Sequence, residues 1–111
     1  MERRRFNRLR TGQRYEIQGL IFFLSANYGA LPPELREMIR DSCSAAAGRS
    51  GNAEALLEYM TRGRTKAQVM LKYYIGSETS IDRMVRAYFL EMERRLREAW
   101  GAKSEERKVK N

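Results

Sequence analysis

Residues 77–101 read SETSIDRMVRAYFLEMERRLREAWG and carry the clearest structural pattern in this chain of 111 residues. Apolar side chains recur there at steps of three and four, which is the period of one face of an α-helix. The residues on this face are Ile81, Met84, Val85, Tyr88, Met92, Leu96 and Trp100. Serine often caps the start of a helix and glycine often follows its end, so we expect one long amphipathic helix that opens at Ser77 and ends at Gly101.

Four shorter helices are predicted before it by the same period and by the residues at their ends. They are expected at residues 12–28, 33–47 and 53–61, and from residue 66 to a break at Gly76 and Ser77. Asn52 suits the cap of the third helix, and Thr65 stands three residues before Gln68, which is the spacing of a capping box. No segment alternates apolar and polar residues as a strand does. We therefore predict an all-α fold, a compact bundle of about five helices.

The helical domain is expected at residues 11–101, between a flexible basic arm at 1–10 and a charged tail at 102–111. The predicted core consists of Ile17, Leu20, Ile21, Leu24, Leu56, Leu57, Val69, Ile81, Val85 and Tyr88. The single cysteine, Cys43, lies toward the apolar side of the second helix. We interpret it as a buried structural thiol and not as a nucleophile.

The net charge is +8, from 22 basic and 14 acidic residues, and it is unevenly distributed. Residues 1–14 contain six arginines and one glutamate, residues 62–76 contain four basic residues and no acidic one, and residues 15–61 are net acidic. Basic clusters of this kind are typical of proteins that bind polyanions. The alternative that composition leaves open is a basic surface that only keeps the protein in solution.

Several classes of function are disfavoured by what the sequence lacks. It contains no histidine, the commonest general base and metal ligand, and one cysteine is too few for a zinc site or an intrachain disulfide. Residues 20–24 form the longest apolar run, far shorter than the roughly 20 residues that span a membrane, and no targeting segment is recognisable. We expect a cytoplasmic protein that is not an enzyme, has no metal or cofactor and binds no membrane.

Residues 65–88 combine a short capped helix, a tight turn and the start of a longer helix, which is the pattern of a helix-turn-helix. In that motif the start of the second helix enters the major groove of DNA. We therefore predict contacts to double-stranded DNA from this helix, from the basic cluster before it and from the N-terminal arm. The predicted contact residues are Arg3, Arg4, Arg5, Arg8, Arg10, Arg62, Arg64, Lys66, Ser77, Thr79, Ser80, Arg83 and Arg86. Glu78 and Asp82 argue the other way, because carboxylates repel phosphates.

The run from Ser77 resembles the recognition half of many bacterial and phage helix-turn-helix regulators. Their pattern is serine, two variable residues, serine or threonine, an aliphatic residue, any residue, and arginine. The matching residues are Ser77, Ser80, Ile81 and Arg83, and the resemblance covers about 24 of the 111 residues. The first half of the motif departs from it, since Leu71 stands where a small alanine is usual. The whole chain is also similar to short helical proteins of phages and mobile elements of Gram-positive bacteria, which implies a transcriptional regulator or a small inhibitor of a host protein, such as an anti-CRISPR protein.

Three functions therefore remain open at the level of sequence. They are a DNA-binding regulator, a protein-binding inhibitor, and a helical assembly protein that forms a homodimer through its last helix. Arg83 and Arg86 fit the solvated face of an amphipathic helix as well as they fit a DNA contact. Tyr73 and Tyr74 are interpreted as packing residues and not as stacking partners of bases.

Overall fold

The structure is a computed structural model that describes residues 16–49 and 51–110, with side chains as far as Ala99. Within these residues the chain forms five helices and one 3-10 turn, and no strand, so the predicted all-α class is confirmed. The described part of the first helix covers residues 16–26 and leads into the 3-10 turn η1 (Tyr28–Ala30). The predicted end at residue 28 is therefore too late, because the chain tightens into η1 ahead of the proline pair at 32–33. The predicted start at residue 12 lies outside the described residues.

Helices α2 (Pro33–Ala47) and α3 (Ala53–Thr61) have the bounds that the sequence predicts. Proline at the first position of α2 costs no hydrogen bond, since that N–H has no partner within the helix. Gly48 ends α2 with φ of 64° and ψ of −161°, a conformation that essentially only glycine adopts. Asn52 caps α3, because its Oδ1 accepts a hydrogen bond from the backbone N–H of Ala55 at 3.1 Å.

Helices α4 (Lys66–Tyr73) and α5 (Glu78–Lys110) also start where the sequence predicts. The capping box at α4 is complete. The N–H of Gln68 donates to Thr65 Oγ1 at 3.1 Å, and the N–H of Thr65 donates to Gln68 Oε1 at 2.9 Å. At α5, Ser77 Oγ accepts from the N–H of Thr79 at 3.1 Å, as an N-terminal cap does.

The ends of α4 and α5 differ from the prediction. Helix α4 stops at Tyr73, before the predicted break at Gly76 and Ser77, and Tyr74 takes the left-handed conformation (φ 56°, ψ 42°). Helix α5 continues past Gly101 to Lys110. Glycine inside a helix costs only about 1 kcal/mol relative to alanine, and the alanine, lysine, glutamate and arginine that follow are strong helix formers.

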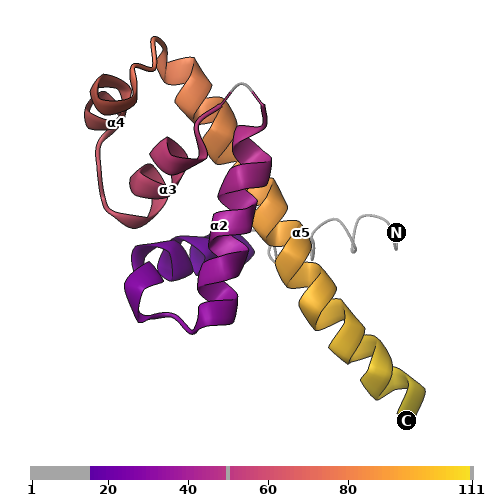
Figure 1. The fold of residues 1–111 in the computed structure, drawn as a ribbon. Coiled ribbons are helices and arrows are strands. Elements are labelled where there is room, and N and C mark those ends of the chain that lie inside the picture. Colours follow the sequence, from indigo (N-terminus) through magenta and orange to yellow (C-terminus); the bar gives the residue numbers. More distant parts are fainter. Residues whose placement is uncertain (1–15, 50, 111) are drawn as a thin grey trace.

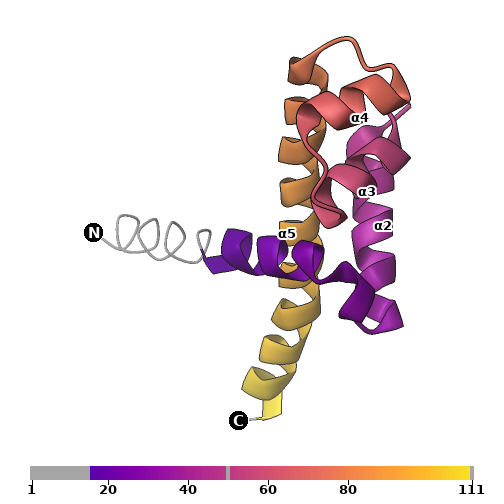
Figure 2. The same cartoon turned by 90° about the vertical axis from the view of Figure 1, so that its left-hand side faces the viewer.

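The longest two helices of the described chain form the scaffold. Helices α2 and α5 run side by side in opposite directions, and α3 and α4 pack at the end of the molecule where α5 begins (Figures 1 and 2). The first helix lies across α5, to which it is tied by Ser25 and Tyr88. Because Ser25 Oγ donates to the carbonyl of Ile21 at 2.7 Å, the Tyr88 hydroxyl is the donor in its 2.7 Å bond to Ser25.

The core lies where these helices meet. Six of the ten predicted core residues are buried, and the other four are half-buried and pack against them. The buried six are Ile21, Leu24, Leu56, Val69, Ile81 and Tyr88. The core also contains Ile39, Cys43, Ala47, Ala55, Met84, Met92 and Leu96, so the interpretation of Cys43 as a buried thiol is confirmed. No helix in the described part of the chain is both long and apolar enough to cross a membrane.

Candidate nucleic-acid interface

The first turns of α5 present polar side chains to solvent. Ile81 and Met84 are buried, and this fixes the opposite side of the helix outward. The exposed residues on that part of α5 are Glu78, Thr79, Ser80, Asp82, Arg83 and Arg86, with Ser77 exposed just before them. This is the orientation that the apolar period of the sequence predicts for this helix.

A buried carboxylate holds part of the basic cluster that precedes α5. The side chain of Glu58 on α3 is only 6% exposed. Its carboxylate accepts hydrogen bonds from Tyr73 and, at 2.9 Å, from Lys72 Nζ. Arg62 and Arg64 lie 3.8 and 3.9 Å from Glu58 Oε1. The bonds from Tyr73 and Lys72 hold the pKa of Glu58 below its ordinary value, so the carboxylate is ionised at neutral pH.

Glu58 is the residue of this region that sequence reasoning missed. Three cations and one carboxylate leave the cluster net positive, but Arg62 and Arg64 face an acidic group of their own chain. One signal was present in the sequence, since Glu58 and Arg62 are four residues apart with the acid first, a favourable pair on a helix. The contribution of Lys72 and Tyr73 depends on how α4 packs against α3, which no local pattern predicts.

Lys66 at the start of α4 forms an ion pair with Asp82 on α5, with 2.6 Å between Nζ and Oδ1. The hydrogen bond to Asp82 raises the pKa of Lys66. This pair joins the two helices of the predicted motif. It also offsets part of the charge of Asp82, one of the two carboxylates expected to repel phosphates.

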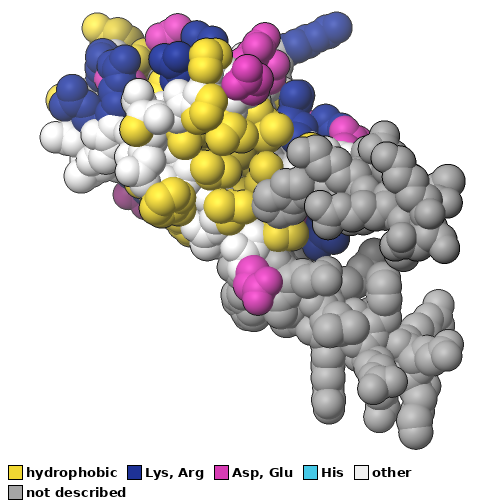
Figure 3. Space-filling view, turned by 90° about the horizontal axis from the view of Figure 1, so that it is seen from below, with side chains coloured by type: hydrophobic (Ala, Val, Ile, Leu, Met, Phe, Trp, Pro, Cys, Tyr) yellow, Lys and Arg dark blue, Asp and Glu magenta, His cyan; other side chains and the backbone are white. Residues whose placement is uncertain are grey.

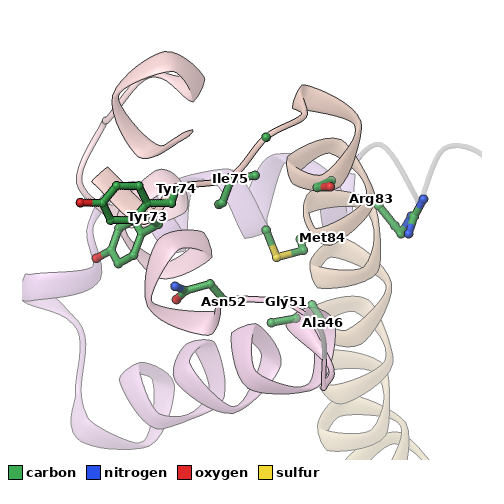
Figure 4. Close-up of a pocket in the computed structure, with 11 residues that line it drawn as sticks. Ala46, Gly51, Asn52, Tyr73, Tyr74, Ile75, Arg83 and Met84 are labelled. Atoms are coloured by element: carbon green, nitrogen blue, oxygen red, sulfur yellow. The ribbon is translucent and has the colours of Figure 1, made fainter. Parts of the chain in front are cut away.

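Arg83 and Arg86 differ from the other basic residues of this region in having no carboxylate partner among the described residues. Neither has a carboxylate oxygen within 4.0 Å among the described residues, and both are exposed. Arg83 and Ser80 line a pocket of about 450 Å³ between the α4–α5 connection and the start of α3. Figure 4 shows Tyr73 and Tyr74 on one side of this pocket and Arg83 on the other, with its guanidinium directed away from it. Arg86 lines a separate groove beside Phe22.

The α4 side of the predicted motif departs from a helix-turn-helix in its packing. Leu71, at the position where an alanine is usual, is 81% exposed and so does not lie between the two helices. Tyr73 is half-buried at Glu58, as its interpretation as a packing residue requires. The same interpretation is wrong for Tyr74, which is 95% exposed.

The arm residues Arg3, Arg4, Arg5, Arg8 and Arg10 lie outside the described residues. In the part of the chain that is described, no group of three or more cysteine, aspartate and glutamate side chains is placed to hold a metal ion. Burial raises the pKa of the Cys43 thiol to about 12, so the thiolate is scarce at neutral pH.

No protein-family model matches this chain, and neither a curated protein nor a solved structure matches it. The resemblance to helix-turn-helix regulators therefore rests on the residues from Ser77 to Arg83.

Proposed function

We propose that this protein is a non-enzymatic DNA-binding protein, a transcriptional regulator of phage type that places the first turns of α5 in the major groove. The observation that carries the proposal is the exposed set Thr79, Ser80 and Arg83, in which Arg83 has no carboxylate partner among the described residues. An arginine of this kind is available for bidentate hydrogen bonds to guanine or for a phosphate.

Local charge supports the same contact. Asp82 is held by Lys66, so its negative charge is partly neutralised beside Arg83. The cluster around Glu58 remains net positive, and it attracts phosphates although Arg62 and Arg64 are partly engaged. We therefore assign the main contact to α5 and a weaker, less specific one to Arg62, Arg64 and Lys66. The arm at residues 1–10 stays a predicted source of salt-dependent affinity.

The test replaces one arginine on α5 and a matched one elsewhere. Arg83→Ala should weaken binding to duplex DNA by about 1–3 kcal/mol if Arg83 contacts a base, and by less if it contacts a phosphate. Arg40→Ala, an equal loss of charge at an exposed position on α2, should change affinity little. Binding is measured by fluorescence anisotropy on random duplex DNA at two salt concentrations, with melting curves of both variants as the control for folding.

Two results would reject this function. One is a parent chain that binds no duplex at low salt, and the other is equal affinity of the Arg83→Ala and Arg40→Ala variants.

The second candidate would then be an inhibitor that binds a host protein. It is favoured by two large exposed side chains, Leu71 on α4 and Tyr74 directly after this helix, which are 81% and 95% exposed. Binding through these side chains should change little with salt.

A further inference from the structure

An apolar groove lies where the first helix crosses α5. It measures about 390 Å³ and is lined by Gln18, Phe22, Arg86, Phe89, Leu90 and Glu93. Phe22 and Leu90 are 60% and 58% exposed, and the ring centroids of Phe22 and Phe89 are 4.9 Å apart. Hydrophobic side chains also gather on the face seen from below, toward the end of the molecule that carries the first helix (Figures 1 and 3). Exposed apolar patches with a polar rim are typical of protein interfaces.

The charges that flank this groove alternate along α5. Asp82, Arg86, Leu90, Glu93 and Arg97 follow one another at steps of four, four, three and four, so they share one side of the helix. We call these five residues the α5 stripe. Its order is negative, positive, apolar, negative, positive.

When the α5 stripe is read in the opposite direction, every charged position has the opposite sign. In an antiparallel pair of α5 helices with a two-fold axis at the midpoint of the α5 stripe, residue 86 of one copy lies opposite residue 93 of the other. Residue 82 lies opposite residue 97 in the same way. Each of these four contacts joins opposite charges, and the apolar part of one copy meets that of the other. A parallel pair would place each charge against its equal, which is unfavourable.

The ion pairs within one copy do not prevent these contacts between copies. Arg86 has no ion pair among the described residues, and it lies about 10 Å along the helix from Glu93, too far for the two to pair within one chain. Glu93 accepts from Arg97 at 3.0 Å through Oε1, and Asp82 accepts from Lys66 at 2.6 Å through Oδ1. Among the described residues, each of these carboxylates is therefore paired with a single cation.

From these observations we infer that the partner of this groove is a second copy of the chain, bound through an antiparallel, two-fold symmetric contact of the α5 stripes. The apolar centre provides burial, and the reciprocal pairs of Arg86 with Glu93 set the direction and register. The inference does not rest on the proposed function, because Thr79, Ser80 and Arg83, which carry that proposal, lie outside the stripe. Arg86, which the sequence also predicts as a DNA contact, is assigned here to the dimer.

The test is a charge exchange followed by sedimentation equilibrium of the full chain. The parent should be mainly a dimer at a chain concentration of about 0.1 mM. Arg86→Glu and Glu93→Arg should each weaken dimerisation about tenfold or more, because each puts like charges together twice in the symmetric pair. The double variant, Arg86→Glu with Glu93→Arg, exchanges the charges and should restore most of the loss. A parent that stays monomeric, or a double variant no better than the single ones, would overturn the inference.

A second pair of variants tests the apolar centre. Leu90→Asp places two carboxylates near the two-fold axis and should abolish the dimer. Leu71→Asp is the control, because Leu71 is more exposed and lies on α4, away from the stripe. Helical circular dichroism and melting curves establish that both variants fold. A Leu90→Asp chain that folds and still forms the dimer would contradict the proposed interface.

Discussion

Glu58 is a buried charge that is stabilised by the groups around it. A carboxylate removed from water is strongly unfavourable unless charged and hydrogen-bonding groups replace the water. Here Tyr73 and Lys72 donate to it, with two arginines within 4 Å. The bonded carboxylate has a lowered pKa, so it binds its proton more weakly in the folded chain than in the unfolded one.

This difference predicts how stability depends on pH. The contribution of Glu58 is complete above the ordinary glutamate pKa of 4.5 and is lost as the pH falls through the lower folded value. Glu58→Gln should lower the melting temperature at neutral pH, because three cations lose their counter-charge. It should also reduce the loss of stability as the pH falls below the ordinary glutamate pKa of 4.5.

Melting curves across this pH range measure both effects. Glu54→Gln, at an exposed position on the same helix, is the matched control and should keep the pH profile of the parent. Identical profiles for the Glu58→Gln and Glu54→Gln variants would show that the buried carboxylate does not stabilise the fold.

At the scale of the elements, the connection between α4 and α5 depends on a strained residue. Tyr74 is in the left-handed region, where a side chain with a Cβ costs about 1–2 kcal/mol relative to the right-handed region. Gly76, the expected break, is not in that region and has open space around its Cβ position. The strain lies therefore at Tyr74, two residues before the glycine.

Tyr74→Gly is expected to raise the free energy of unfolding by about 0.5–1 kcal/mol, since glycine adopts the left-handed conformation freely but loses more entropy on folding. Gly76→Ala should be neutral or stabilising by up to about 1 kcal/mol, because it restricts the unfolded chain without a clash. Chemical denaturation at one pH compares the two variants. Destabilisation by Gly76→Ala would instead support the turn that the sequence suggested.

These elements also show which parts of the structure can be predicted from sequence. The starts of α3 and α4, directly after the caps Asn52 and Thr65, were predicted correctly, because a cap needs only a few neighbouring residues. The end of α4 was not, since a left-handed tyrosine contradicts the local preference of a residue with a Cβ. In the candidate site, the exposure of Arg83 followed from the apolar period of α5. The position of Glu58 did not, because its partner Lys72 comes from another helix.

At the scale of the whole molecule, the first helix contributes to the core through its contact with α5. Leu24 on this helix is buried. Leu24→Ala should lower the free energy of unfolding of the protein by about 2–5 kcal/mol, through lost burial and the cavity left behind. Leu71→Ala removes the same atoms from an exposed position and should cost little. Equal free energies of unfolding for these two variants would exclude the first helix from the core.

Helix α5 extends far beyond the core that it helps to form. Its 33 residues correspond to a rod of about 50 Å, and its C-terminal part projects beyond the other helices (Figure 1). Among the described side chains, the last buried one is Leu96. Backbone amides near Tyr88 can exchange with solvent deuterium only when the core opens, whereas those toward Lys110 need only local fraying. A single continuous helix thus contains two regimes of local stability, and protection from exchange should decline along it from the core toward Lys110.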